Sequence, residues 1–372
     1  MRFALTSLLV IHGLIHLLGF VKAFGLAQVP QLTGRTIVTL GPAWQRPIGG
    51  LWLVAAVLVC AAAVLMLLDV AWAWQVGVAA LVLSQALIIH AWPDAKAGTA
   101  ANLILGVAVL AAWADQRFER DSRAAVRELY AGLDTAPRAP ITDADVAGLP
   151  APVARWLTRA GAVGRPRPHA THLTQRGGLR TEPGGKWLPA AAVQDFDLDA
   201  PGFVWSVDVT MLRVVPVRGR DRYDGGRGHM LIAALALVPM VDARGPAIDQ
   251  GAALRFLGEL VWSPGAALAP YLRWTAVDDT HADATLTWGD RAVTGRFTID
   301  LDGHVTGFAA RRYLGGGADA KLEDWWVACT AWAPLDGVEV PTRGQVTWKL
   351  AKGDFTYYDW EIASVAYDRP GR

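Results

Sequence analysis

The stretch "IDQGAALRFLGELVW", residues 248–262, is a helical pattern inside a long series of strand-like segments. Leu254, Leu257 and Val261 recur at helical spacing and form one apolar stripe. Such a stripe must be buried, and a long sheet tends to curl around a helix that it covers. The segment therefore predicts an α+β domain in which an antiparallel sheet forms a half-barrel curled around an inserted helix.

The segments on both sides of this helix have a period of two and are rich in Val, Thr, Trp and Phe, which is typical of strands. Short links such as "WGDR" (288–291) and "AKGD" (351–354) suit antiparallel hairpins. We expect roughly nine to eleven strands in this domain. The clearest patterns cover 172–181, 203–213, 271–279, 282–289, 292–303, 304–313, 325–334, 344–350 and 355–368.

The N-terminal third has a different character. Of the whole chain, 53% of residues are hydrophobic and 19% are charged, below the roughly 25% usual in soluble domains. Four apolar stretches predict a bundle of about four transmembrane helices, each needing about 20 residues to span a bilayer. They cover about 3–24, 48–68, 72–90 and 100–113. The alternative for the first stretch, a cleaved signal peptide, fits Arg2 and its apolar core, but three further spans follow it.

These patterns divide the chain into a transmembrane region (1–115), a charged helix with a Pro-rich linker (116–150) and a β-rich domain (151–372). With four spans, both ends of the bundle lie on one side of the membrane. That side carries Arg2, Arg117, Arg120, Arg123 and Arg127, against Lys22, Arg35, Arg46 and Lys96 on the other. The positive-inside rule therefore favours a multi-pass protein of the inner cell membrane with a cytoplasmic C-terminal domain.

Two histidines lie in the first apolar stretch, "LLVIHGLIHLLGF" (8–20). His12 and His16 are four residues apart, so they share one face of a helix. They could hold a haem or a metal, or they could be buried and hydrogen-bonded to neighbouring helices. His90 offers a poor match in depth for a bridged haem, so we expect packing and interhelical hydrogen bonds. The alternative is a polar site shared with the third apolar stretch, where Gln85 offers a partner. We expect no cofactor and no metal.

The two cysteines, Cys60 and Cys329, form no zinc-binding or disulfide pattern. The net charge of +1 gives no reason to expect a nucleic-acid partner. The expected partners are membrane lipid and a hydrophobic small molecule, and nothing in the sequence identifies a protein partner.

The densest polar stretch is "RGRDRYDGGRGHM" (218–230). Arg220, Asp221 and Tyr223 precede a run of glycines, which could form a turn that presents these side chains to a ligand. Neither a phosphate-binding loop nor a dinucleotide fingerprint is present. The alternative is a hairpin turn in which an Arg–Asp pair fixes the register of two strands.

The inserted helix carries a second candidate. Arg255 and Glu259 are four residues apart, the spacing of an ion pair on a helix surface. If the helix lies inside the sheet, Glu259 instead faces a cavity, where burial would raise its pKa. Trp262, Trp205 and Trp274 belong to an excess of tryptophan, 17 in the chain, that could line an apolar ligand cavity or fill the core.

Two acidic stretches have weaker patterns. Asp278 and Asp279 are adjacent in "VDDTHADATL", so in a strand their side chains would point to opposite faces. Asp300 and Asp302 in "IDLDGH" occur in a stretch too short for a calcium loop. We expect both stretches to form turns.

The region from "LPAPVARWL" to "WKLAKGDFTYYDWEI", roughly 150–365, resembles a bacterial family known as domain of unknown function 6544. The motifs that carry the resemblance are "GRPRP", "PGFVW", "GRDRYDGGRG", "ARGPAIDQGAALRFLGELVWSP" and "PTRGQVTWKL". The resemblance implies N-terminal membrane helices and no established catalytic residue.

We therefore expect a polytopic membrane protein whose β-rich domain binds an apolar or amphiphilic ligand, such as a lipid. The candidate ligand-binding residues are Arg220, Asp221, Tyr223, Glu259, Trp262, Trp205 and Trp274. The alternative is a membrane-bound enzyme acting on a lipid-soluble substrate. Its reacting groups would be Arg220, Asp221, Glu259 and Asp278 or Asp279.

Overall fold

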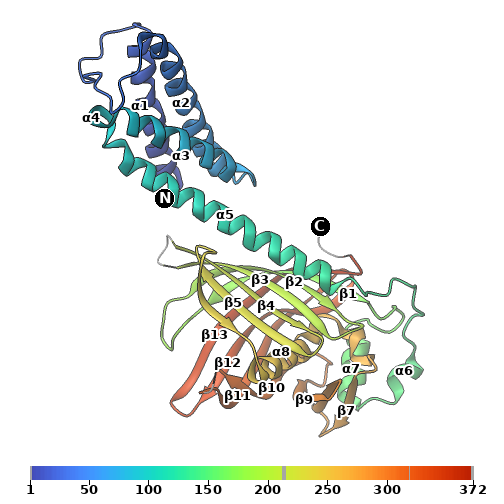
Figure 1. The fold of residues 1–372 in the computed structure, drawn as a ribbon. Helices are drawn as coiled ribbons and strands as arrows, with labels where there is room; N and C mark the ends of the chain where they lie inside the picture. The colour runs from blue at the N-terminus through green and yellow to red at the C-terminus, as the bar shows by residue number, and fades with distance from the viewer. Residues whose placement is uncertain (1, 212–214, 318, 370–372) are drawn as a thin grey trace. The chain divides into compact units, whose positions relative to one another are not determined.

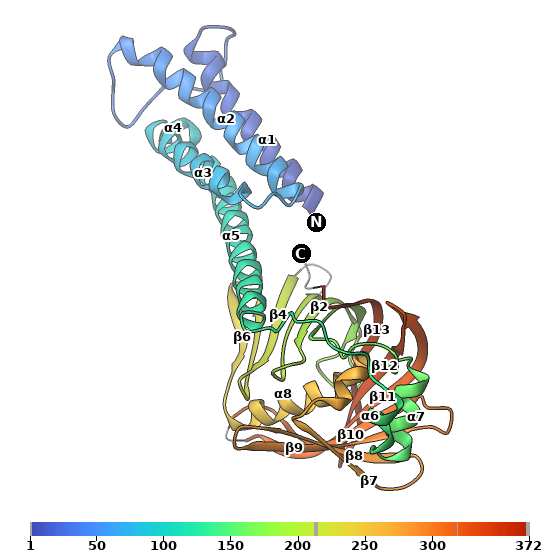
Figure 2. The same cartoon turned by 90° about the vertical axis from the view of Figure 1, so that its right-hand side faces the viewer.

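The computed structural model describes residues 2–211, 215–317 and 319–369. The chain forms two compact units, Met1–Glu119 and Arg120–Arg372 (Figures 1 and 2). The last two residues of the strand predicted at 203–213 lie outside the described residues.

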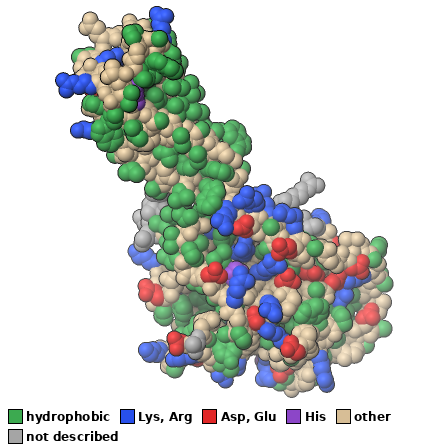
Figure 3. Space-filling view, in the orientation of Figure 1, with side chains coloured by type: hydrophobic (Ala, Val, Ile, Leu, Met, Phe, Trp, Pro, Cys, Tyr) green, Lys and Arg blue, Asp and Glu red, His purple; other side chains and the backbone are tan. Residues whose placement is uncertain are grey.

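The first unit is a helical bundle. Its helices are α1 (Arg2–Ala23), the 3-10 turn η1 (Pro42–Trp44), α2 (Gln45–Leu67), α3 (Ala73–His90), the short α4 (Trp92–Ala95) and the beginning of α5 (Gly98–Leu129). Four of them are long and apolar enough to cross a membrane, as predicted. Hydrophobic side chains cover their outer surface (Figure 3). The fourth apolar stretch, short by itself, is the first part of the 32-residue helix α5.

A polar network occupies the interior of this bundle. Hydrogen bonds join His12 Nε2 to Asn102 Oδ1 at 2.9 Å and His16 Nε2 to Ser84 Oγ at 2.8 Å. Asn102 also donates to Gln85 Oε1 at 3.0 Å. The predicted interhelical hydrogen bonds of both histidines are confirmed. Their partners, Asn102 and Ser84, were not indicated by the sequence, and Gln85 joins the network through Asn102.

The second unit is built on one antiparallel sheet. It is preceded by α6 (Asp143–Ala147) and α7 (Ala151–Arg159). Thirteen described strands pair in the order β6-β5-β4-β3-β2-β1-β13-β12-β11-β10-β9-β8-β7, so the predicted count of nine to eleven is too low. The strands are β1 (Ala170–Leu179), β2 (Leu188–Asp197), β3 (Gly202–Met211), β4 (Val215–Asp224), β5 (Arg227–Ala234), β6 (Val238–Ala243), β7 (Leu272–Ala276), β8 (His281–Trp288), β9 (Arg291–Ile299), β10 (Val305–Leu314), β11 (Lys321–Leu335), β12 (Val338–Leu350) and β13 (Gly353–Tyr367).

The inserted helix connects the two edges of this sheet. The chain leaves the edge strand β6, passes through α8 (Pro246–Glu259) and two 3-10 turns, η2 (Leu260–Trp262) and η3 (Pro264–Leu268), and enters the opposite edge strand β7. Figure 2 shows α8 lying inside the curve of the sheet. The sheet is not closed, and the predicted half-barrel curled around an inserted helix is confirmed.

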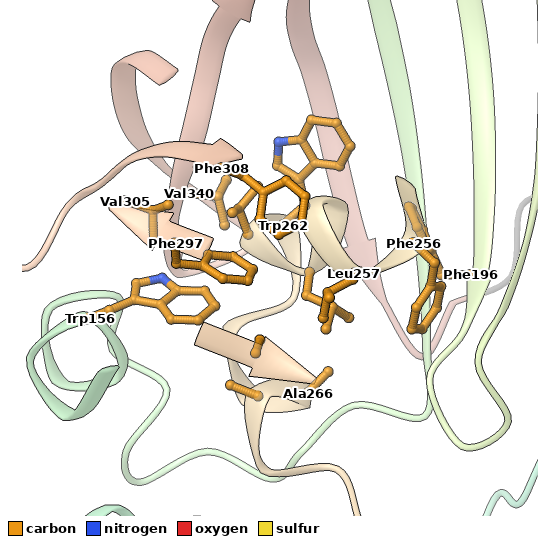
Figure 4. Close-up of a cluster of buried hydrophobic side chains, with 14 of the residues drawn as sticks. Trp156, Phe196, Phe256, Leu257, Trp262, Ala266, Phe297, Val305, Phe308 and Val340 are labelled. Carbon is orange, nitrogen blue, oxygen red and sulfur yellow. The ribbon is translucent and has the colours of Figure 1, made fainter. Parts of the chain in front are cut away.

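The core lies between α8 and the concave face of the sheet. Leu254 and Leu257, on the predicted apolar stripe, are fully buried, and Phe256 is buried on another side of the helix. Figure 4 shows this cluster together with Trp156 of α7 and Phe297 of β9, whose rings stack with centroids 5.9 Å apart. Because the sheet surrounds α8, the helix is buried on most sides and not along one stripe alone.

Candidate functional site

A cavity of about 310 Å³ lies between α8 and the concave face of the sheet. This volume is within the range of roughly 300–1,000 Å³ typical of small-molecule sites, and about twice that of an engineered ~150 Å³ cavity that binds benzene. Most of the wall is apolar, with a few charged groups. The lining residues include Leu179, Trp205, Val207, Val209, Val217, Met230, Leu231, Ile232, Val261, Trp262, Val327, Val346 and Trp360, with Arg180, Asp221, Arg255, Glu259, Arg312 and Tyr357.

Helical and strand periodicity explain how the charged groups reach this cavity. Arg255, Glu259 and Trp262 are spaced by four and three residues, so they share the side of the helical segment that borders the cavity. On β4 the side chains alternate between the two faces of the sheet, and Asp221 is on the buried, concave face. Asp221 therefore meets the charged side of α8.

Asp221, Arg255 and Glu259 form a buried ionic triad. Arg255 donates from Nη1 to Asp221 Oδ2 and from Nε to Glu259 Oε1, each at 2.8 Å. The three side chains are 5%, 12% and 15% exposed, respectively. Burial raises the pKa of Glu259, and its hydrogen bonds and attraction to Arg255 oppose that shift. The expected ion pair between Arg255 and Glu259 therefore forms. It lies in the cavity and not on an exposed helix surface, as the alternative expectation for Glu259 had it.

Neutral side chains extend the triad across the sheet. Gln194 on β2 donates to Glu259 Oε2 at 2.6 Å, and Gln175 on β1 donates to Gln194 Oε1 at 3.2 Å. Gln175 Oε1 in turn accepts hydrogen bonds from Trp205 Nε1 at 3.1 Å and from Tyr358 Oη at 2.8 Å. These contacts fix the orientation of one cavity-lining tryptophan and hold the Glu259 carboxylate in place.

A second cation, Arg312 on β10, borders the same cavity. Its guanidinium carbon lies 4.8 Å from the ring centre of Trp325 and 5.7 Å from that of Trp348. Its Nη1 is 3.4 Å from Tyr357 Oη, which also accepts a hydrogen bond from Trp325 Nε1 at 3.1 Å. Aromatic rings and one phenol thus surround this buried cation.

Four of the seven predicted binding residues, Asp221, Glu259, Trp262 and Trp205, line the cavity, and Arg220 borders it from β4 with its side chain on the opposite face of the strand from Asp221. The other two are packed elsewhere in the core. Tyr223 contacts Phe203 and Phe256, with ring centres 6.3 and 6.2 Å apart. Trp274 packs on Phe297 and donates from its indole to a backbone carbonyl.

The side chains of Arg220 and Asp221 lie on opposite faces of β4. The predicted hairpin turn forms at Gly225 and Gly226, both with positive φ, and an Arg–Asp pair forms beside it, since Arg222 donates to Asp224 Oδ2 at 2.7 Å. Arg220 and Asp221 are adjacent in the strand, so their side chains point apart. The charge of Arg220 interacts with Asp121, near the end of α5. Asp221 pairs with α8 instead.

The two acidic stretches form turns, as predicted. Asp278 accepts hydrogen bonds from Thr280 and His281 in the exposed turn between β7 and β8, and Asp279 is in the same turn. Asp300, Asp302 and His304 bring their ligand atoms within 4.8 Å of one another. Asp300 accepts from the backbone amides of the other two residues at 3.0 and 2.8 Å, so it closes the β9–β10 turn.

The first unit contains a larger cavity, of about 860 Å³, bordered by His12 and His16 and by the charged residues Lys22, Arg35 and Asp94. Both nitrogens of His16 are hydrogen-bonded, and Asp94 on α4 accepts hydrogen bonds from Thr33 and Gly34 of the α1–α2 connection. This cavity lies among the candidate membrane spans.

Two solved structures are remotely similar to this chain. A DUF1329 family protein from Desulfovibrio piger is 11% identical, with a TM-score of 0.36, over 63% of this chain and 96% of that one. A LolA superfamily protein from Nitrosomonas europaea is 12% identical, with a TM-score of 0.31, over 57% of this chain and 92% of that one. No curated protein matches significantly.

One protein family matches over most of the chain. The model of a family of unknown function, DUF6544, covers residues 139–360, which contain α8 and nearly all of the sheet. The resemblance found in the sequence motifs is thereby confirmed, and the chain belongs to the DUF6544 family.

Proposed function

We propose that this protein is a membrane-anchored binding protein whose β unit holds an apolar or amphiphilic ligand, such as a lipid, in the cavity beside α8. The observation that carries this proposal is the cavity itself. Its volume suits a small molecule, its wall is mostly apolar, and a few buried charged groups line it. Asp221, Glu259, Trp205 and Trp262 belong to the proposed binding wall. The four apolar helices supply the membrane anchor.

The contacts of the carboxylates favour binding over catalysis. A general acid or base must be within reach of the proton that it transfers. Both oxygens of Glu259 and one of Asp221 are already hydrogen-bonded to Arg255 or Gln194. Asp278 and Asp279 are in an exposed turn outside the cavity wall. The alternative, an enzyme that uses Asp278 or Asp279 together with Glu259, is therefore less well supported, because these groups do not meet in one cavity.

Copurification tests the proposal. The full chain is purified into nanodiscs of one synthetic lipid, and bound compounds are identified by extraction and mass spectrometry. Val207→Trp fills the cavity, whereas Val193→Trp places the same ring on the outer face of the adjacent strand, where Val193 is 41% exposed. We expect a host-derived compound in the wild type and in the Val193 variant that is missing from the Val207 variant. Equal content in all three would contradict a ligand in this cavity.

We also propose that the protein is in the inner cell membrane with its β unit in the cytoplasm, following the distribution of arginine and lysine around the spans. Reporter fusions after residue 372 test this orientation. Activity of a reporter that functions only outside the cytoplasm would reverse it.

A further inference from the structure

Arg312 is a buried cation without a counter-charge in the described part of the chain. Arg312 is 9% exposed, and its Nε has no hydrogen-bond partner. No carboxylate of the described residues lies within ion-pair distance of its guanidinium, whereas Arg255 on the same cavity has two. The aromatic rings around it offset only part of the cost of removing a guanidinium from water. The site is therefore electrostatically incomplete.

The backbone of α8 passes close to one edge of this unpaired group. A Cβ at Gly251 would be 3.0 Å from Arg312 Nε and 3.4 Å from Nη2, closer than a side chain normally packs. Glycine therefore lets the helix pass beside the guanidinium, and Arg312 itself lines the cavity.

A third arginine gives the cavity a net positive charge. Arg180 lines the cavity, its guanidinium carbon lies 3.8 Å from the ring centre of Trp187, and its Nε is also buried without a partner. The two carboxylates of the ionic triad are both shared with Arg255. The charges of Arg180 and Arg312 are thus left for a ligand.

We infer that the ligand is an amphiphile with an anionic oxygen headgroup, a carboxylate or a phosphate ester, which binds to Arg312 and leaves its chain along the apolar wall. This inference rests on the proposed function and deepens it by naming the class of ligand. The chain would lie against Val207, Val217, Ile232 and Val327, which line the same cavity. The headgroup would supply the counter-charge that Arg312 lacks.

Photolabelling separates this inference from the proposed function. The full chain in zwitterionic nanodiscs is labelled with a long-chain fatty acid carrying a diazirine, or with the matching fatty alcohol, and labelled peptides are mapped. We expect the acid to label the cavity peptides of β4, β5 and β11 at least about tenfold more than the alcohol, since hydrogen bonds to charged groups contribute about 1.5–3 kcal/mol. Acetate in equal excess should not protect these peptides.

Variants then assign the preference to Arg312. Arg312→Met and Arg312→Gln should reduce acid labelling to the level of the alcohol and leave alcohol labelling unchanged, and Arg312→Lys should retain part of the preference. Arg311→Met is the matched control, because this neighbour is 62% exposed and pairs with Asp324 on the other face.

Equal labelling of wild-type cavity peptides by acid and alcohol would overturn the anionic headgroup and leave the proposed function standing. Labelling of these peptides by neither compound would overturn both. Protection by acetate alone would show a site for small anions and overturn the amphiphile. The comparison of acid and alcohol labelling in the wild-type protein tests the inference even if a variant does not fold.

Discussion

Replacing Arg255 by methionine tests whether the buried ionic triad acts as one electrostatic unit. Methionine keeps an unbranched apolar stem but removes the cation that Asp221 and Glu259 share. Asp221 is then a 5% exposed carboxylate without its ion-pair partner. Removing one member of a buried pair costs about 3–5 kcal/mol because a charge is left uncompensated. We expect a loss of stability of this size for Arg255→Met at neutral pH.

The loss should be visible in the melting temperature of the β unit. For a unit of this length, 1 kcal/mol corresponds to about 2–4 °C, so the expected decrease is about 6–20 °C. In the variant, burial raises the pKa of Glu259 and the arginine no longer opposes this shift. The folded state then binds a proton more tightly than the unfolded state, so stability increases as the pH falls through the raised pKa. The deficit should therefore be larger at pH 8 than at pH 5.

Pulse proteolysis of the full chain in nanodiscs measures this effect, because peptides of the β unit are quantified separately from those of the helices. The control is Arg343→Met, which removes an exposed ion pair with Glu361 from a side chain that is 63% exposed. Exposed pairs contribute about 0–1 kcal/mol. If Arg255→Met melts within about 2 °C of wild type, or if its deficit does not change with pH, the triad is not an electrostatic unit.

Three further predictions concern other parts of the molecule. Burial raises the pKa of the Cys329 thiol to about 12, so in a Cys60→Ala background a maleimide at pH 8 should modify the chain only after denaturation; rapid modification of the folded protein would contradict this burial. Gly344→Ala places a Cβ 2.1 Å from the carbonyl oxygen of Ala328 and should destabilise the β unit by about 1–3 kcal/mol, measured by the same proteolysis; an unchanged stability would show that the strands can separate at this point. Asn102→Leu removes the residue that joins His12, Ser84 and Gln85 in the polar network. It should destabilise the helical unit by about 1–2 kcal/mol, since single interhelical hydrogen bonds average about 0.6 kcal/mol. Detergent-induced unfolding measures this stability, and a stabilised bundle would refute the structural role of Asn102.

The half-barrel could be predicted from the sequence because one helical pattern stands among strands of clear period two. The strands that were missed have identifiable reasons. β2 is rich in alanine, which has low β propensity, and β4 is rich in arginine, so it resembles a loop. The β5–β6 hairpin turns at Leu235 and Ala236, both at φ 54°. Without glycine or asparagine at these positions, the sequence contains no turn signal.

Only those residues of the candidate site whose position follows from helical or strand periodicity could be predicted from the sequence. Glu259 and Asp221 follow from helical spacing and strand alternation. The same alternation places Arg312 inward beside an outward Arg311, a signal in "ARRY" that the sequence interpretation did not use. Gln175 and Gln194 could not be found, because their contact with α8 depends on how β1 and β2 pair across the sheet.

The position of β13 beside β1 has a consequence for biosynthesis. The end of β1, Leu179, and the beginning of β13, Gly353, are 174 residues apart, which a ribosome covers in about 10–35 s at 5–20 residues per second. During that interval β1 is an open edge that can pair with other chains. A chain that ends before Gly353 lacks a strand from the middle of the sheet, so it exposes β1 and β12 as two new edges in addition to those at β6 and β7.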